Sequence, residues 1–176
     1  MPRVFLIEPH SGKKNDCKLN ASHLTASFDC GIQGLNNFLI EHAMHNQRAC
    51  SANTYIACEG NTVIGFYTLA VGSVIHAQAP ARITKGLARH PVPVMVLARL
   101  AVDRTHHGED IGSGLLKDAL IRTILASEIA GIRALLVHAK DENAREWYQR
   151  FDFDPSPTDP LHLYLLLKDI RKALNS

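Results

Sequence analysis

Three glycines follow a strongly apolar stretch, at a place where the chain is suited to bind a phosphate group. Gly108, Gly112 and Gly114 lie among polar residues, after the apolar stretch 94–102 and before a helical apolar stripe that starts at Leu115. A turn from a strand into a helix directs free backbone N–H groups and the positive helix end at one spot, which suits a pyrophosphate. The same glycines also fit a tight turn that only allows close strand–helix packing, so the turn alone leaves both interpretations open.

A second group of residues is suited to nucleic acid. Arg82, Lys85 and Arg89 recur at spacings of three and four, with no acidic residue between them. On one helical turn they would share a face, and a cationic face suits a phosphate backbone, although an ordinary solvated face fits equally well. The net charge of the 176-residue chain is only +2, with ten histidines. Contact with nucleic acid would therefore depend on such local clusters.

The sequence gives little support for a metal site, a disulfide framework or a membrane segment. The four cysteines form no Cys-x-x-Cys pair, which favours reduced thiols in a cytoplasmic protein. His42 and His45 would lie three apart on a helix, but no third ligand is apparent. No apolar run reaches the length of a membrane span, and Val4–Ile7 is too short for a signal peptide. We expect a cytoplasmic protein that needs no metal and no membrane.

The elements that position these residues follow from periodicity. Apolar residues on both faces of 94–102 predict a strand that is buried on both sides. Helical spacing predicts a helix over 34–48, and turn residues at 59–61 predict a hairpin between strands 54–58 and 63–71. The proline-containing run 80–93 should be a loop or a short helix outside the sheet.

The C-terminal third should continue the alternation of strands and helices. Gly131 is a typical helix stop, 134–137 predicts a short buried strand, and Asp141 can cap the helix that follows. A last apolar strand over 161–167 precedes a basic tail, and one further edge strand is expected within residues 1–23. With 46% hydrophobic residues, the chain is long enough for one sizeable core. The sequence therefore predicts one domain of the α/β class, with a mixed sheet and right-handed crossovers.

Two stretches carry a resemblance to a known family. The run LARLAVDRTHHGEDIGSGLL resembles motif A of the GNAT N-acetyltransferases, in which a buried strand leads into an acetyl-CoA turn of pattern Gln/Arg-x-x-Gly-x-Gly/Ala. His107 takes the place of Gln/Arg, Asp110 takes that of the central glycine, and Gly112 is the last glycine. The run DENAREWYQRFDF is similar to motif B of the family, with Ala144 and Tyr148 four apart on a helix.

The N-terminal part narrows the resemblance to one subfamily. The runs FDCGIQGLNNFLIEHAMHNQ and TYIACEGNTVIGFYTLAVGSV, with the basic run after them, resemble the GNAT toxins of type II toxin–antitoxin operons over nearly the whole chain. The resemblance implies a single-domain GNAT fold over residues 1–176, in which helices flank a mixed central sheet. It also implies acetyl transfer from acetyl-CoA to the α-amino group of aminoacyl-tRNA, which blocks translation. The implied partners are a ribbon-helix-helix antitoxin, operator DNA bound through that antitoxin, and a second copy in a homodimer.

The resemblance also assigns roles to residues. Tyr148 is implied to be the general acid that protonates the CoA thiolate, and no obvious general base accompanies it. The pantetheine is expected along the strand, with a backbone N–H of that strand as oxyanion donor. Contacts to acetyl-CoA are assigned to Leu100, Ala101, Val102, His107, Gly108, Glu109, Asp110, Ile111, Gly112, Ser113 and Asp141. Contacts to tRNA are assigned to Arg82, Lys85, Arg89 and Arg99.

Asp110 departs from the family pattern in a way that affects function. At the central glycine of a pyrophosphate turn, a side chain opposes φ > 0 and a carboxylate adds repulsion. A second such departure is Asp152, before Phe153, where Asp tolerates the left-handed conformation better than most residues. Two other hypotheses therefore remain open: a GNAT that acetylates a small amine or a protein lysine, and a catalytically impaired toxin that acts only in an antitoxin–repressor complex.

Overall fold

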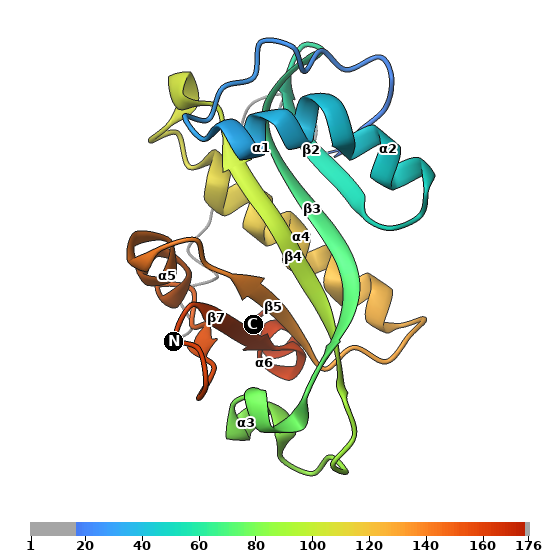
Figure 1. Cartoon of the computed structure of the whole chain (residues 1–176), viewed down its shortest axis with the longest axis vertical. Helices are drawn as coiled ribbons and strands as arrows, with labels where there is room; N and C mark the ends of the chain where they lie inside the picture. Colours follow the sequence, from blue (N-terminus) through green and yellow to red (C-terminus); the bar gives the residue numbers. More distant parts are fainter. Residues whose placement is uncertain (1–16, 175–176) are drawn as a thin grey trace. The chain divides into compact units, whose positions relative to one another are not determined.

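One mixed sheet organises the part of the chain that the computed structural model describes, residues 17–174 (Figure 1). Within that part the sheet has seven strands in the order β1-β2-β3-β4-β5-β7-β6. The strands are β1 (Cys17–Lys18), β2 (Asn53–Glu59), β3 (Thr62–Val74), β4 (Val92–Val102), β5 (Ala134–His138), β6 (Asp154–Pro155) and β7 (His162–Leu166). The helical segments are α1 (Gln33–Asn37), η2 (Phe38–His42), α2 (Ala43–Arg48), η3 (His76–Gln78), α3 (Ala81–Thr84), η4 (Arg104–His106), α4 (Ile111–Ser127), α5 (Glu142–Gln149) and α6 (Leu167–Leu174).

The described residues fall into two compact units, and two strands contribute residues to both. We call residues 17–70 and 98–119 the turn unit, and residues 71–97 and 120–174 the α5 unit. β3 and β4 are each divided between them. The turn unit contains the predicted glycine turn, and the α5 unit contains Tyr148.

β3 in the turn unit is covered on both faces because its side chains alternate. Phe66 is fully buried and stacks on Phe38 of η2, with ring centroids 6.1 Å apart. On the opposite face, a Cβ on Gly65 would lie 2.9 Å from Leu115 of α4. Tyr67, on the same face as Gly65, donates its hydroxyl hydrogen to Asp118 of α4. Helices thus pack on both faces of this strand, as its long apolar run requires.

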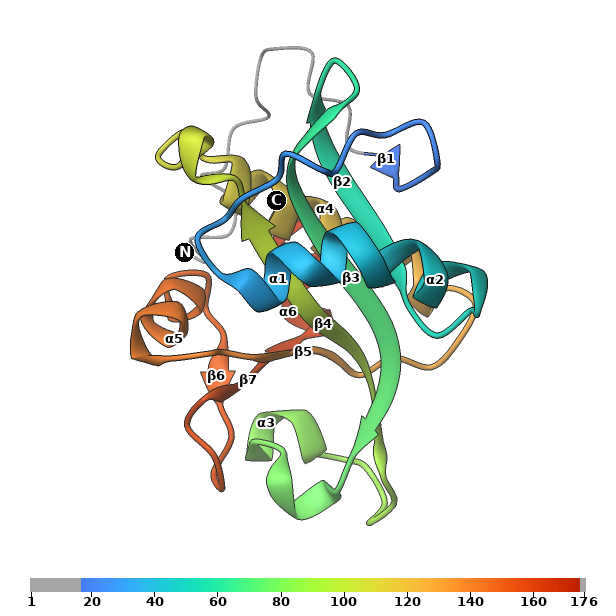
Figure 2. The same ribbon diagram turned by 45° about the horizontal axis from the view of Figure 1, so that its top comes forward.

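The predicted helix over 34–48 is confirmed, with a π-helical segment in its middle. α1, η2 and α2 follow one another without a break and cross over one face of β2 and β3 (Figure 2). Their apolar side, with Phe38, Leu39 and Ala43, is buried in the core of the turn unit. The predicted hairpin is also confirmed, because β2 and β3 pair antiparallel around a turn at Gly60 and Asn61.

The α5 unit combines parallel and antiparallel pairing. β4 pairs parallel with β5 from Val94–Ala134 to Leu97–Val137, and β5 pairs antiparallel with β7. A hydrophobic core cluster formed by residues of these strands and of α3 includes Ile83, Tyr164 and Leu166. The predicted basic tail after the last strand is wrong in form, because Leu167–Leu174 is the helix α6, with Leu167 and Ile170 buried. The sequence analysis followed the apolar run and overlooked its change to helical spacing.

At the N-terminal side, the predicted edge strand is present as β1, which pairs antiparallel with β2. The apolar run Val4–Ile7 lies outside the described residues. Between residues 17 and 174, no helix combines the length and the apolar character that crossing a membrane requires. Within the same residues, no group of three or more His, Cys, Asp or Glu side chains is arranged to hold a metal ion.

Candidate active site

The downstream half of β4 is more open than the sequence predicts. Val94, Met95 and Leu97 are buried, in agreement with a strand covered on both sides. The prediction is wrong for most of the last five residues, because Ala98 is exposed and Arg99, Leu100 and Val102 are only half-buried, whereas Ala101 is buried. The parallel register with β5 ends at Leu97. The residues assigned to the pantetheine, 100–102, therefore lie on the half of the strand that keeps accessible surface.

Residues 107–113, which we call the glycine turn, follow β4 through the short helix η4. Asp103 caps η4, since its carboxylate accepts from the Thr105 N–H at 2.9 Å. The His107 ring nitrogen Nε2 lies 2.8 Å from the Val102 carbonyl, which can only accept, so this nitrogen bears the hydrogen. Gly108 has φ of +85°, a conformation that glycine adopts at little cost. The turn is thereby attached to the end of the strand.

α4 starts at Ile111, so Gly112 and Ser113 belong to its first turn and do not precede it. The first N–H groups of a helix have no acceptor within the helix, and the helix dipole adds positive potential there. Asp110 directly before α4 accepts from the Gly114 N–H at 3.0 Å and from the Ser113 hydroxyl at 2.8 Å through its backbone carbonyl. The start of this 17-residue helix is therefore of the kind that can bind an anion.

Asp110 and Asp152 both adopt the left-handed backbone conformation, which the sequence analysis considered tolerable for Asp152 and unfavourable for Asp110. Their φ angles are +57° and +65°. Asp110 is exposed and stands next to the first turn of α4. Asp152 ends the α5 region, where its N–H donates to the Gln149 carbonyl at 3.1 Å. Phe153 is then buried, 3% exposed, after this tight turn.

Tyr148 is held in the α5 unit by its own helix and by aromatic neighbours. Asp141 caps α5, and its carboxylate accepts from the Ala144 N–H at 2.8 Å, as the sequence predicts. The Tyr148 ring packs edge-on against Trp147 and Phe153, with centroids 4.9 and 5.5 Å away. Burial raises the pKa of Tyr148 well above that of an ordinary phenol. The residue is therefore a proton donor over the whole neutral range.

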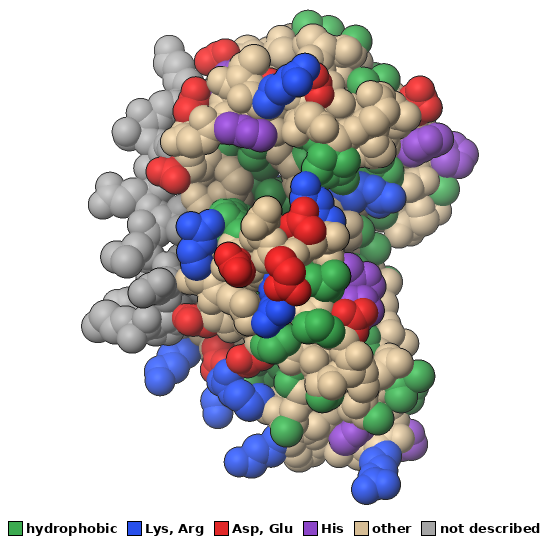
Figure 3. Space-filling model, turned by 60° about the vertical axis from the view of Figure 1, so that its left-hand side comes forward, with side chains coloured by type: hydrophobic (Ala, Val, Ile, Leu, Met, Phe, Trp, Pro, Cys, Tyr) green, Lys and Arg blue, Asp and Glu red, His purple; other side chains and the backbone are tan. Residues whose placement is uncertain are grey.

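The predicted cationic face of 82–89 does not form. α3 contains only Ala81–Thr84, so Lys85 and Arg89 lie beyond its end. Arg82 donates to Asp154 at 2.9 Å and to Asp169 at 2.5 Å, and these bonds, that to Asp169 above all, raise its pKa. The acids come from distant parts of the sequence, which is why local spacing missed them. On the face in Figure 3, acidic and basic side chains lie side by side.

Arg99 lies in the turn unit, on the open half of β4. Its guanidinium stacks on the Phe38 ring, 3.7 Å from the ring centroid, and Phe38 in turn stacks on Phe66. Partial burial lowers the pKa of Arg99, although a guanidinium stays charged under all physiological conditions. A cation fixed on an aromatic ring is ready to receive an anionic group without first losing side-chain freedom.

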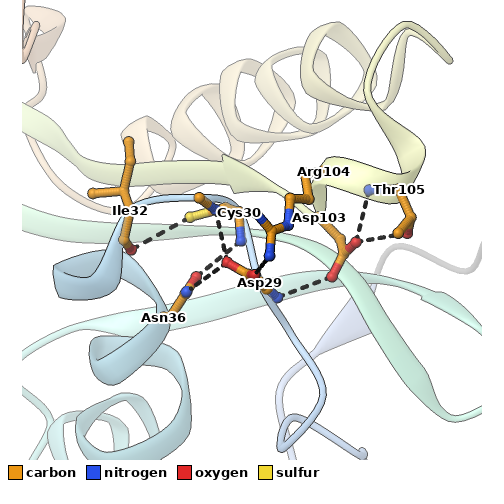
Figure 4. A network of polar contacts seen from close by, with 8 residues as sticks. Asp29, Cys30, Ile32, Asn36, Asp103, Arg104 and Thr105 are labelled. Atoms are coloured by element: carbon orange, nitrogen blue, oxygen red, sulfur yellow. Dashed lines mark hydrogen bonds and ion pairs between the residues drawn. The ribbon is translucent and has the colours of Figure 1, made fainter.

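The sequence analysis missed a polar network that joins the loop before α1 to the residues after β4 (Figure 4). The network contains Asp29, Asn36, Asp103, Arg104 and Thr105. Asp29 and Asp103 are 74 residues apart. Periodicity and short motifs carry no signal for a pairing of that range, so the network was visible only in the structure.

Comparisons with known proteins agree with this arrangement. Residues 50–155 match the acetyltransferase (GNAT) domain family. The chain is 44% identical to a tRNA-acetylating toxin of Mycobacterium tuberculosis (strain ATCC 25618 / H37Rv), over 93% of this chain and 98% of that protein.

Three solved structures with 27–29% sequence identity are similar over most of their length. AtaT complexed with acetyl-methionyl-tRNAfMet is 29% identical with a TM-score of 0.85, over 91% of this chain and 98% of that chain. A tyrosine-to-phenylalanine mutant of AtaT, bound to the C-terminus of the antitoxin AtaR and acetyl-CoA, is 27% identical with a TM-score of 0.80, over 92% and 98%. The AtaT–AtaR complex bound to DNA is 28% identical with a TM-score of 0.75, over 91% and 99%.

Proposed function

The chain belongs to the GNAT acetyltransferase family, and from that premise we propose that it moves an acetyl group from acetyl-CoA to the α-amino group of aminoacyl-tRNA. The observation that carries the proposal is the 44% identity to a tRNA-acetylating toxin over nearly the full length of both chains. Such transfer removes the amine that a ribosome needs for elongation, so the protein would block translation as a toxin. We infer that the two compact units form one domain, since the family match includes residues of both.

The acetyl donor is assigned to the turn unit. The pyrophosphate of acetyl-CoA would bind the N–H groups at the start of α4, and the pantetheine would follow Leu100–Val102 on the open half of β4. The acetyl-CoA bound to the similar toxin AtaT supports this assignment. A backbone N–H of the same strand would stabilise the oxyanion as the amine attacks the thioester carbonyl.

Tyr148 would donate its proton to the CoA thiolate as the C–S bond breaks. Its high pKa keeps the phenol protonated, and a thiolate that is leaving is basic enough to take the proton in the same step. The attacking amine needs no strong base, because an α-amine has a pKa of about 8 and an ester at its α-carbon lowers this further. A water molecule would accept the ammonium proton of the tetrahedral intermediate.

The tRNA would contact cations of both units. Arg99, whose guanidinium stacks on Phe38, is a candidate for a tRNA phosphate, and Lys85 and Arg89 would add contacts in the α5 unit. AtaT, at a TM-score of 0.85, is complexed with acetyl-methionyl-tRNAfMet, which supports a tRNA substrate here.

We further infer a cognate antitoxin of the ribbon-helix-helix type, binding of operator DNA through it, a homodimer of the toxin, and a cytoplasmic location. The antitoxin and DNA complexes of AtaT support an antitoxin partner and DNA binding in complex with it. An acidic, disordered antitoxin tail would be attracted to cations such as Arg99 and Lys85.

Asp110 favours a second candidate function, that of an impaired toxin. Its exposed carboxylate, directly before the first turn of α4, opposes binding of a pyrophosphate. A protein with weak acetyl-CoA affinity would act mainly in the antitoxin–repressor complex.

Controlled expression in a bacterial host separates these functions. The wild-type chain should arrest growth, Tyr148→Phe should not, and co-expression of the antitoxin from the adjacent reading frame should restore growth. If wild type and Tyr148→Phe are equally harmless while Asp110→Gly arrests growth, the impaired-toxin function is correct. If all three leave growth unchanged, the toxin proposal fails.

A further inference from the structure

Hydrogen bonds and an ion pair connect the loop before α1 to the segment between β4 and the glycine turn (Figure 4). The Asp29 N–H donates to Asp103 Oδ2 at 2.9 Å, and the Arg104 N–H donates to the Asp29 carbonyl at 2.9 Å. The Arg104 guanidinium pairs with the Asp29 carboxylate. Each of these two segments, which are far apart in the sequence, therefore donates a backbone N–H to the other, and an ion pair between their side chains adds to these bonds.

Asp29 is itself fixed on the side of α1. Its Oδ1 accepts from the Gly31 N–H and from the Asn36 amide, both at 2.9 Å. Asn36 is only 6% exposed, and its side-chain oxygen Oδ1 accepts from the Cys30 N–H at 2.9 Å. These bonds, that from Gly31 above all, lower the pKa of Asp29, so the carboxylate is charged. Its Oδ1 accepts two hydrogen bonds and its Oδ2 pairs with Arg104. A carboxylate held this way has little freedom to move.

A short series of backbone hydrogen bonds connects Asp103 and Arg104 to the glycine turn. The His106 N–H donates to the Asp103 carbonyl at 2.9 Å, the His107 N–H to the Arg104 carbonyl at 3.4 Å, and the Glu109 N–H to the His106 carbonyl at 3.4 Å. Asp103, 8% exposed, also accepts from the Thr105 hydroxyl at 2.6 Å. The position of Asp103 and Arg104 therefore determines where the N–H groups before α4 point.

We propose that Asp29 and Arg104 are positioning residues that set the glycine turn for the pyrophosphate of acetyl-CoA. The inference rests on the proposed function, because it deepens the role of the same acetyl-CoA site. Neither side chain is required to touch the ligand. Their effect should be confined to the pyrophosphate end of CoA, since the pantetheine lies on β4 itself.

Binding of coenzyme A and of pantetheine, measured by NMR titration on the full chain, tests this assignment without tRNA. Arg104→Met removes the ion pair at an exposed side chain, and Asp29→Asn removes the charge at nearly constant shape. Each should weaken coenzyme A binding by about 5- to 20-fold, since small displacements of a positioned group cost affinity steeply. Pantetheine, which lacks the pyrophosphate, should bind within about twofold of wild type in both variants.

Two comparisons separate positioning from a loss of folding. The double variant should bind coenzyme A no more weakly than the worse single variant, because both changes break one interaction. Glu128→Gln, which breaks the exposed Arg171–Glu128 pair of the α5 unit, is the matched control and should leave both ligands unaffected.

Equal weakening for coenzyme A and pantetheine, or additive losses in the double variant, would overturn the positioning role and leave a structural one. Unchanged coenzyme A binding in Asp29→Asn and Arg104→Met would overturn it as well, with the proposed function intact. If the wild-type chain and Asp110→Gly both fail to bind coenzyme A, the proposed function and this inference fall together.

Discussion

Asp110 combines two features, a left-handed backbone and a carboxylate, that both make glycine the more favourable residue at this position. Its φ of +57° is the left-handed conformation, which costs a residue with a side chain on the order of 1 kcal/mol. Its carboxylate stands beside the helix start that would bind pyrophosphate. At about 5 Å and an effective dielectric near 20, repulsion amounts to roughly 3 kcal/mol per unit of phosphate charge before salt screening. The conformation favours glycine, and the ligand favours a neutral residue.

Asp110→Gly should therefore bind acetyl-CoA at least about tenfold more tightly than the wild type, because even half of this repulsion corresponds to about one factor of ten, whereas the backbone cost is already present in the ligand-free chain. Asp110→Asn, which removes the charge and tolerates φ > 0, should recover part of the gain. Calorimetry at low and moderate salt measures all three, and the difference between wild type and Asn should shrink as salt rises. Equal affinities would mean that the carboxylate points away from the phosphates.

Tyr148→Phe should keep the fold and the acetyl-CoA affinity but lower kcat by about 100-fold or more, because it deletes a proton donor and almost no volume. The pKa of Tyr148 is raised, so its protonated form persists as pH increases and kcat of the wild type should not fall between pH 7 and 9. Initial rates of acetyl transfer over this range test both statements. An unchanged kcat in the variant would remove Tyr148 from the reaction.

At the scale of elements, the approach of β3 to α4 determines where the helix start lies. A Cβ on Gly65 would lie 2.9 Å from Leu115 Cδ1 and 3.1 Å from Ile111 Cγ2, so these two buried side chains in the first two turns of α4 would have to shift. Gly65→Ala should lower the free energy of unfolding by about 1–3 kcal/mol, as overpacking does, and should weaken CoA binding. Urea unfolding and calorimetry measure the two effects.

Gly34→Ala is the matched control for that change, because a Cβ there meets nothing within 4 Å and the residue lies in α1. It should be neutral or stabilising by up to about 1 kcal/mol, since alanine favours a helix. Equal stability of Gly65→Ala and Gly34→Ala would show that the contact between β3 and α4 yields easily.

The basic run 82–89 should contribute to tRNA binding through two of its three cations. Arg82 is already neutralised by Asp154 and Asp169, whereas Lys85 and Arg89 are exposed. Changing Lys85 and Arg89 together to Ala should reduce the log–log salt slope of tRNA binding by about 1.4 to 1.8, because each lost phosphate contact accounts for about 0.7 to 0.9. Arg82→Ala should change the slope less. Filter binding from 50 to 200 mM salt measures it, and an unmoved slope in the double variant would mean that the run is only a solvated face.

Over the whole chain, the sequence predicted the features that local patterns control. The helix over 34–48, the hairpin, the cap at Asp141 and the tolerated left-handed turn at Asp152 follow from spacing and from backbone preferences of neighbouring residues. It could not predict what depends on distant partners. Arg82 pairs with acidic residues 72 and 87 positions away in the sequence. The ion pair between Asp29 and Arg104 likewise connects the loop before α1 to the residues that follow β4. The open half of β4 was missed because its sequence is as apolar as a buried strand.

The most direct test of the account is the chemical identity of the acetylated product. The chain is incubated with radiolabelled acetyl-CoA and a bulk pool of charged tRNA, with deacylated tRNA, free amino acids and a lysine-rich protein as parallel acceptors. Nuclease digestion and mass spectrometry then identify the labelled species. The account predicts N-acetyl-aminoacyl-adenosine from charged tRNA, absent with deacylated tRNA and reduced about 100-fold by Tyr148→Phe. Label on the free amino acids or on protein lysines, in place of the charged tRNA, would contradict it.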